Sequence, residues 1–578
     1  MSRKTEQRLI FDSIILGFVG ALSAQLFMLM IHGCDSFFLH FLAHYHEPSL
    51  ASEGGSLSEG IGKYGLWLIP VVTTVGGLIS GFIVYQFAPE AEGHGTDTAV
   101  KSFHRSGGYI RARVPFLKMI ASAITIGSGG SAGREGPIAL IASGVGSIYA
   151  GFRDRSDKER RILVLIGMAA GLSAIFRSPV GSAIFAVEVL YGSMEFEASA
   201  LIYTLLASIV AYAINGLFAG WKPLFDVPHD VGISSIEGYL YYVLLGVACG
   251  LASTLLPEIF YGIRDKFKAI PIPNHVKPAI GGLLLGLIAL TLPQVLGGGY
   301  GWIQEAIDGN IALYLLITLI FAKMIAFTLT VSSGGSGGVF APSLYVGAMI
   351  GGVFAYIFHQ PPAGFVIVGM AAIFSGAAHV PIAALLMVSE MTGGYELLVP
   401  AALAVLVSYL LQERLSTNLK YNSLYEAQVP YRSDSPAHLE EHFQIAWDLI
   451  NNKNIKLPNS IGHLDLVSLI KSGVPIDLID GEKFMLGELS PDSPLKGKKW
   501  SDEDCDVLKD KSELIAVMRK GDILMPDSDL RFKPKDQLLI LADTKAAEKL
   551  QKVLNPPSSS REGQLDDTTQ DSSKEQQS

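Results

Sequence analysis

Long apolar stretches separated by short polar segments fill the first three-quarters of this chain. They cover residues 9–32, 64–88, 114–126, 137–150, 162–191, 197–219, 237–262, 277–295, 311–331, 338–358, 363–378, 380–392 and 397–412. A helix needs about 20 apolar residues to cross the hydrocarbon core of a bilayer. Several stretches are shorter than this and are broken by glycine, which is typical of half-helices packed inside a membrane protein. The pattern therefore predicts an all-α polytopic membrane protein with interrupted half-helices.

Charged residues become frequent only after residue 430. Residues 431–578 hold 47 of the 98 Asp, Glu, Lys and Arg residues, although the whole chain is only 17% charged and 49% hydrophobic, with a mean hydropathy of +0.37. Soluble domains carry about 25% charged residues. We therefore expect four parts, which are a transmembrane domain over 1–430, a helical linker over 431–472, a small α+β cytoplasmic domain over 473–556 and a disordered tail over 557–578.

Basic clusters predict which polar segments face the cytoplasm. Lys and Arg gather in 3–8, 101–118, 153–161, 264–268 and 414–420. Because short loops rich in Lys and Arg stay on the cytoplasmic side, both termini are predicted to be cytoplasmic. The first apolar stretch has no small-residue cleavage site, so we expect it to remain as a transmembrane helix.

The apolar part contains an internal repeat. Two segments align without gaps, Gly129-Gly-Ser-Ala-Gly-Arg-Glu-Gly-Pro137 and Gly334-Gly-Ser-Gly-Gly-Val-Phe-Ala-Pro342. Further on, Gly167-Met-Ala-Ala170 with Pro179, Glu188 and Gly192 matches Gly369-Met-Ala-Ala372 with Pro381, Glu390 and Gly394. The offsets are 205 and 202 residues. Two membrane halves with matching broken helices indicate inverted repeats with a transport site at their interface.

The glycine runs suggest what that site binds. Glycine lets backbone N–H groups approach a ligand closely, and the positive end of a helix dipole favours an anion. Such a site lacks a full charge, so it can release the ion, as conduction requires. Close helix packing is the other explanation for the glycines. Because two copies match, we favour an anion site.

Glu135 is the strongest single candidate for chemistry in this region. Burying an ionisable residue in a membrane is costly, so such a residue indicates a function. The helix N-terminus favours its ionised form and burial disfavours it, so local conditions can switch its protonation. A static ion pair with Arg134 is the alternative, but adjacent helical residues point in different directions.

These segments resemble signatures of the CLC family of chloride channels and transporters. The resemblance covers about residues 10–428 and rests on Gly133-Arg-Glu-Gly-Pro137, Gly337-Gly-Val-Phe-Ala-Pro342, and Pro381-Ile-Ala-Ala followed by Glu390-Met-Thr-Gly393. It implies that Glu135 is a gating glutamate, which occupies an anion position when ionised and swings away when protonated. The further residues that it implies around the anion are His94, Gly95, Arg134, Gly136, Val339, Phe340, Ala341 and Tyr425, the last closing the inner end. It also implies a homodimer with one pore per subunit.

Two positions depart from the family pattern. Where the family commonly has Gly-Ser-Gly-x-Pro, this chain has Gly93-His-Gly-Thr-Asp97, so His94 replaces the serine that usually touches the central anion. His94 either donates to the anion, becomes cationic or only lines the inner vestibule. At the carboxylate pair of coupled members, Glu188 matches the first position and Val189 replaces the internal proton-transfer glutamate. Valine cannot carry a proton, which weakens an antiporter interpretation, and for Glu188 we favour a structural role.

The tail domain resembles a TrkA-C module, the C-terminal lobe of K⁺ conductance regulators, most clearly over 514–554. Sensing of a small-molecule ligand and stabilisation of a dimer are both left open for it. This resemblance also raises a remote alternative, a component of potassium transport. The membrane part has no Thr-Val-Gly-Tyr-Gly filter, which argues against that alternative.

The function predicted from the sequence is transport of chloride or a similar small anion through a midplane pore, coupled to proton antiport. A passive chloride channel is the alternative. The sequence shows no nucleophile with a base, no metal-ligand cluster and no Walker loop between a strand and a helix. We therefore do not expect an enzyme, a cofactor or a bound metal. The net charge of −10 disfavours a nucleic-acid partner, which leaves the anion, protons and the lipid bilayer as the expected partners.

Overall fold

A computed structural model describes residues 3–228 and 236–437 and, further on, 476–477, 482–491, 493–499, 512–519, 522–524 and 530–554. The chain divides into two compact units, residues 1–430 and 431–578, which are described separately below. Most of the predicted linker, 431–472, and the whole predicted tail, 557–578, lie outside the described residues.

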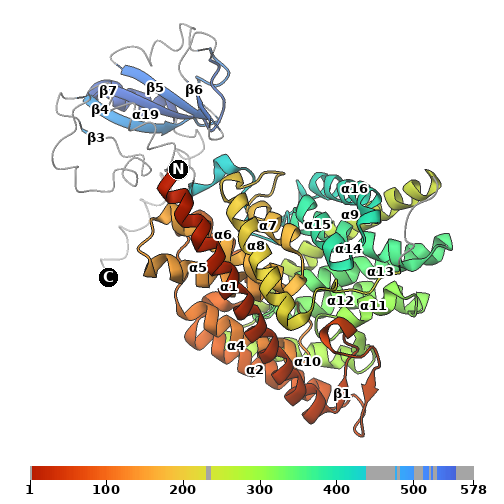
Figure 1. Ribbon diagram of the computed structural model, residues 1–578. Coiled ribbons are helices and arrows are strands. Elements are labelled where there is room, and N and C mark those ends of the chain that lie inside the picture. Colours follow the sequence, from red (N-terminus) through yellow and green to blue (C-terminus); the bar gives the residue numbers. More distant parts are fainter. Residues whose placement is uncertain are drawn as a thin grey trace, which may run out of the picture. The chain divides into compact units, whose positions relative to one another are not determined.

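The described part of the first unit is a bundle of helices in two consecutive sets (Figure 1). The first set is α1 (Arg3–Asp35), α2 (Ile69–Phe87), α3 (Thr96–Arg105), α4 (Arg113–Gly127), α5 (Glu135–Phe152), α6 (Asp157–Phe176), α7 (Pro179–Glu188) and α8 (Ala198–Ala219). The second set is α9 (Ile236–Ala269), α10 (Lys277–Ala289), α11 (Tyr300–Ile307), α12 (Leu313–Ser332), α13 (Phe340–Phe358), α14 (Pro362–Ala378), α15 (Pro381–Thr392) and α16 (Leu398–Ser416). Within the described ranges, 7 helices are long and apolar enough to cross a membrane. The prediction of a polytopic helical protein is confirmed.

The packing of the two sets follows the repeat. α5 packs on α6 as α13 packs on α14, and α6 contacts α7 as α14 contacts α15. Between the sets, α2 packs against α10 and α7 against α15, which are equivalent elements. The matched elements therefore meet each other, as two halves related by a pseudo-two-fold axis would.

The apolar stretch 162–191 forms two helices. α6 begins with a capping box, in which Ser156 accepts from the amide of Glu159 and the Glu159 side chain accepts from the amide of Ser156. It ends where Arg177 takes a left-handed conformation, with φ of 55°. α7 begins at Pro179, whose missing N–H suits the first position of a helix. The break therefore divides one long apolar stretch into a helix and a short half-helix, a division that the hydropathy pattern did not predict.

The segment between α1 and α2 has structure of its own. A π-helix (Ser36–Ala43) follows α1, and the strands β1 (Tyr45–His46) and β2 (Gly60–Ile61) pair antiparallel around a 3₁₀ turn at Ala51–Glu53. Arg177 fixes this segment by donating to the carbonyl oxygen of Ser52 at 2.7 Å, and the Ser52 hydroxyl donates to the carbonyl oxygen of Leu224 at 2.6 Å. The turn that carries Glu53 is thus held against two other parts of the unit.

The described part of the second unit is an antiparallel sheet with one helix. The strand order is β3-β4-β7-β5-β6, formed by β3 (Ile476–Asp477), β4 (Glu482–Glu488), β5 (Ser512–Arg519), β6 (Asp522–Leu524) and β7 (Gln537–Asp543). The helix α19 (Thr544–Leu554) contacts β4 and β7. Leu550 and Leu554 of α19 are buried in a core with Val517, Leu538 and Ile540 from β5 and β7. The prediction of a small α+β domain is confirmed.

Candidate functional site

The two glycine-rich segments meet backbone to backbone. The amide of Gly133 donates to the carbonyl oxygen of Gly338 at 2.8 Å, and the amide of Gly338 donates to the carbonyl oxygen of Gly133 at 2.7 Å. A Cβ on Gly338 would lie 2.8 Å from both this oxygen and the amide nitrogen of Gly136, so the approach requires glycine. Because α5 and α13 begin directly after these bonds, the N-termini of both helices point at one small region. The two repeated glycine segments therefore meet where the repeats face each other.

A third loop, Gly93-His-Gly95, completes the backbone of this region. Gly337 donates its amide to the carbonyl oxygen of Gly93 at 3.2 Å. A Cβ on Gly136 would lie 2.0 Å from the carbonyl oxygen of His94. Gly95, with φ of 87°, directly precedes α3. The loop therefore brings a third helix N-terminus to the same place.

The carboxyl group of Glu135 is buried at the point where these termini converge. Glu135 is 1% exposed, and neither of its oxygens has a hydrogen-bond partner among the described residues. The position of a Cβ on Gly133 would be 2.1 Å from Glu135 Oε2 and 3.1 Å from the amide nitrogen of Ala341. The carboxyl group thus lies beside the first turn of α13, where backbone N–H groups have no helical partner. This is where the sequence predicts an anion.

Aromatic rings and apolar side chains enclose the site. The ring of His94 lies 5.4 Å from that of Tyr425 and 6.2 Å from that of Phe260, and His94 Nδ1 has no hydrogen-bond partner among the described residues. Phe340 packs between Phe176 and Phe374, at ring distances of 4.4 and 4.2 Å. Glu135, His94 and Tyr425 are all buried here, as are Val339, which directly precedes α13, and Ala341 in its first turn. The structure therefore brings these predicted residues together.

Arg134 points to a different partner. Its guanidinium binds the carboxylate of Glu53 through both terminal nitrogens, Nη1 at 3.1 Å from Oε2, and lies 4.6 Å from the centre of the Tyr300 ring. Burial raises the pKa of Glu53, but the charge and hydrogen bonds of Arg134 more than offset this and hold that pKa below its usual value. A cavity of about 230 Å³ adjoins this pair. The alternative of a static pair between Arg134 and Glu135 is wrong, and contact of Arg134 with an anion stays a prediction.

Two buried lysines that the sequence analysis did not single out each hold a glycine loop, and one of these is the His94 loop of the site. Lys118 donates to the carbonyl oxygens of Ala91 at 3.0 Å and of Gly93 at 2.6 Å. Lys323 donates to the carbonyl oxygens of Val295, Leu296 and Gly297, at 2.9, 3.3 and 2.9 Å. Both lysines are fully buried, and they are separated by 205 residues, the offset of the glycine repeat. A lysine within an apolar helix, repeated at that offset, is the sequence signal by which both residues can be found.

Glu188 and Glu390 cap each other's helices. Glu188, at the end of α7, accepts from the amides of Ile382 and Ala383 in the first turn of α15, at 3.1 and 2.7 Å. Glu390, near the end of α15, accepts from the amides of Val180 and Gly181 in the first turn of α7, at 3.1 and 2.8 Å. The structural role favoured for Glu188 is confirmed.

The fold and the site define a polytopic membrane protein with converging helix N-termini. Residues 76–413 match the family model described as voltage gated chloride channel. The chain therefore belongs to this family, which is the CLC family named above.

Relatives and solved structures agree with this assignment. A putative chloride channel protein ClcB-like from Ralstonia nicotianae is 28% identical over 59% of this chain and 82% of its own length. The H(+)/Cl(−) exchange transporter ClcA from Vibrio parahaemolyticus is 29% identical over 68% of this chain and 87% of its own length. The structure of a slow cyanobacterial Cl⁻/H⁺ antiporter superposes with a TM-score of 0.63 at 20% identity, covering 72% of this chain and 96% of the antiporter. At that identity the likeness shows the fold.

Proposed function

We propose that this protein exchanges chloride or a similar small anion for protons across a membrane. The observation that carries this proposal is the carboxyl group of Glu135, which lies against the first turn of α13 without a hydrogen-bond partner among the described residues. When ionised, this group takes the position that the backbone amides offer to an anion. When protonated, it is neutral and gives way to the anion. The protonation state of Glu135 therefore decides whether its carboxylate or the anion occupies this position. This link between proton binding and anion binding is the basis of exchange.

The surrounding residues have stated roles in this proposal. Amides at Val339, Phe340 and Ala341 hold the anion, helped by the N-terminal dipoles of α5 and α13. Gly95 and Gly136 let the third loop come close enough to take part. His94 and Tyr425 line the inner side, and the unpartnered Nδ1 of His94 supports a direct contact with the anion. Their arrangement gives several partial charges and no fixed pair, so the anion can leave again.

A passive anion channel is the second candidate, and a specific observation favours it. Val189, where coupled family members have an internal glutamate, is fully buried and apolar. A proton that passes this region needs another carrier. The ClcA relatives are named as exchange transporters, which supports coupling.

Flux measurements on purified protein in vesicles decide between the two candidates. A chloride gradient is imposed, and a pH electrode follows protons while a chloride electrode follows the anion. Exchange predicts that protons are driven against their gradient, and that Glu135→Ala removes this movement. Chloride flux without proton movement at any pH would show that the protein is a channel.

We further propose that the protein forms a homodimer with one pore per subunit and has both termini in the cytoplasm, as the resemblance implies. For the second unit we propose a regulatory role like that of TrkA-C modules. Its compact sheet and helix support this proposal. Cross-linking in the membrane tests the dimer, and protease accessibility in sealed vesicles tests the orientation. Chloride flux with and without the second unit, compared at equal protein in the membrane, tests regulation. The potassium alternative predicts potassium flux in the same vesicles, and the anion site argues against it.

A further inference from the structure

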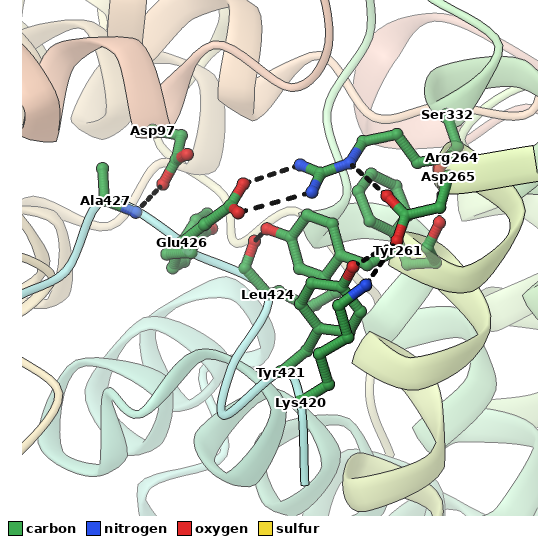
Figure 2. Close-up of polar contacts among 12 residues, drawn as sticks. Asp97, Tyr261, Arg264, Asp265, Ser332, Lys420, Tyr421, Leu424, Glu426 and Ala427 are labelled. Carbon is green, nitrogen blue, oxygen red and sulfur yellow. Dashed lines mark hydrogen bonds and ion pairs between the residues drawn. The ribbon is translucent and has the colours of Figure 1, made fainter. Parts of the chain in front are cut away.

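Asp97 places a carboxyl group beside the segment that carries Tyr425. It is the second residue of α3, directly after the glycine loop of the site, and it is partly buried. The amide of Ala427 donates to Asp97 Oδ1 at 2.8 Å, across 330 residues of sequence (Figure 2). The family pattern has proline at this position, so the carboxyl group distinguishes this chain.

Two basic groups of the cluster around Asp97 are bound to other acids. Arg264 of α9 pairs with Glu426, with Nη1 at 2.7 Å from Oε2, and stacks on the ring of Tyr261 at 4.2 Å (Figure 2). Lys420 pairs with Asp265 at 2.7 Å. Among the ion pairs of the described residues, none includes Asp97. Its carboxyl group is therefore free to change its charge without breaking an ion pair.

The balance of charges suits a group that exchanges protons near neutral pH. α3 has only 10 residues and is not one of the membrane-spanning helices. Burial raises the pKa of Asp97 to about 7, and the nearby Glu426 acts in the same direction. The hydrogen bond from Ala427 and the charges of Arg264 and Lys101 act in the opposite direction.

Polar groups connect Asp97 with the anion site. Thr96, its buried neighbour in the chain, has its side chain close to that of Tyr425. The Tyr425 ring lies 5.4 Å from the ring of His94, whose Nδ1 has no partner among the described residues. Both Asp97 and Glu135 are close enough to Tyr425 for their charges to act on its hydroxyl. Two hydroxyl groups and an imidazole, from Thr96, Tyr425 and His94, are thus gathered near Asp97 and the site, while the side chain of Val189 has no polar atom.

We propose that Asp97 is the proton acceptor on the Tyr425 side of the site and replaces the carboxyl group missing at Val189. The inference rests on the proposed exchange function. In each cycle, the protonated carboxyl of Glu135 loses its proton and the carboxylate of Asp97 gains it, so charge and protons balance. The proton then leaves Asp97 for the water at that mouth, and the reverse sequence loads Glu135.

The test compares Asp97→Asn with the wild type in the vesicle assay. Asparagine keeps the size and the oxygen that accepts from Ala427, but it does not ionise. We expect chloride flux within about twofold of wild type and loss of uphill proton movement, whereas Asp97→Glu keeps proton movement. Asp265→Asn is the matched control, because this carboxylate belongs to the same cluster but binds Lys420 and Tyr421. It should leave coupling unchanged.

Two further measurements separate the outcomes. Val189→Glu added to Asp97→Asn should restore proton movement, because it returns a carboxyl group to the family position. If the wild type couples and Asp97→Asn couples equally, this inference is wrong and the exchange function stands. If the wild type itself moves no protons, the exchange function fails. If Asp97→Asn does not fold, the rate of proton transport by the wild type is measured instead. The pH on the Tyr425 side is varied from about one unit below to about one unit above the Asp97 pKa of about 7. A rate that does not change over this range contradicts the proposal.

Discussion

The two halves of the membrane unit share a backbone plan and differ in the side chains at the pore. Lys118 and Lys323 correspond, and each binds the carbonyl oxygens of a glycine loop. Glu188 and Glu390 correspond, and each caps the other's helix. Both pairs join segments that are distant in sequence, so they stabilise the scaffold in each half.

The halves differ where α5 and α13 begin. Glu135 in the first half corresponds to Phe340 in the second, and Arg134 corresponds to Val339. In the glycine loops, Gly93 and Gly297 each accept from the corresponding lysine, and aligning these two residues pairs His94 with Gly298 and Asp97 with Gly301. At these four pairs of positions, the ionisable side chains thus all belong to the first half. The comparison indicates that repeated polar residues build the scaffold and unrepeated ones carry the transport chemistry.

The largest effect is expected at Glu135, which has no polar counterpart in the second half. Glu135→Gln should abolish uphill proton movement and the pH dependence of chloride flux, because glutamine does not ionise. The side chain is similar in size, so the protein should remain folded. Chloride flux and proton flux in vesicles at several pH values measure both. A pH dependence equal to that of wild type would contradict the gating role.

Both repeated lysines should contribute to stability, but only one of them should affect transport. Replacing either with Met leaves buried carbonyl oxygens without a donor, at about 1–3 kcal/mol for each unsatisfied group. The loss should be smaller for Lys118→Met, because Ala91 also accepts from Ser336 and Gly93 also accepts from Gly337. Thermal unfolding in detergent measures stability.

Anion affinity then distinguishes the two lysines. Lys118 anchors the loop of the anion site, so Lys118→Met should weaken chloride binding measured by calorimetry. Lys323→Met should leave the affinity close to that of wild type, because its loop lies beside Tyr300 and the cavity near Arg134. Equal losses of affinity in both variants would contradict the division between scaffold and chemistry.

A smaller effect is expected at His94. His94→Ser replaces the unpartnered ring nitrogen by a hydroxyl, so chloride affinity should change by the energy of about one hydrogen bond, ~1 kcal/mol or roughly fivefold. Unfolding temperature should change little, since the ring makes aromatic contacts but no side-chain hydrogen bond among the described residues. Binding isotherms measure the affinity. An isotherm identical to that of wild type would mean that the histidine only lines the vestibule.

The smallest effect on transport is expected at the reciprocal caps. Glu188→Gln and Glu390→Gln each keep one oxygen and lose the charge at a helix N-terminus, which should cost about 1 kcal/mol in either half. Proton coupling should be unchanged in both variants. Thermal unfolding and vesicle flux provide the two readouts. Loss of coupling in Glu188→Gln alone would show that this carboxyl group takes part in proton transfer.

The sequence predicted the helical class, the repeat and most of the residues that the structure brings together at the candidate site. Glycine runs followed by proline report directly on backbone conformation, and their repetition identified the loops that meet at Gly133 and Gly338. It also predicted Glu135 correctly as a buried carboxyl group at a helix N-terminus. It missed the partner of Arg134, because Glu53 lies in a polar segment whose sequence has no periodic signal.

What the sequence determined by itself is therefore local, namely where helices begin, where they break and which residues are too costly to bury without a role. Tertiary structure decided which distant groups meet. The bond from Ala427 to Asp97 spans 330 residues, and the pair of Glu53 with Arg134 spans 81. Hydrophobic periodicity records which face of a helix is buried and leaves open the partner that faces it. Only the packing of the two halves placed Asp97 beside the segment of Tyr425 and the carboxyl of Glu135 against α13.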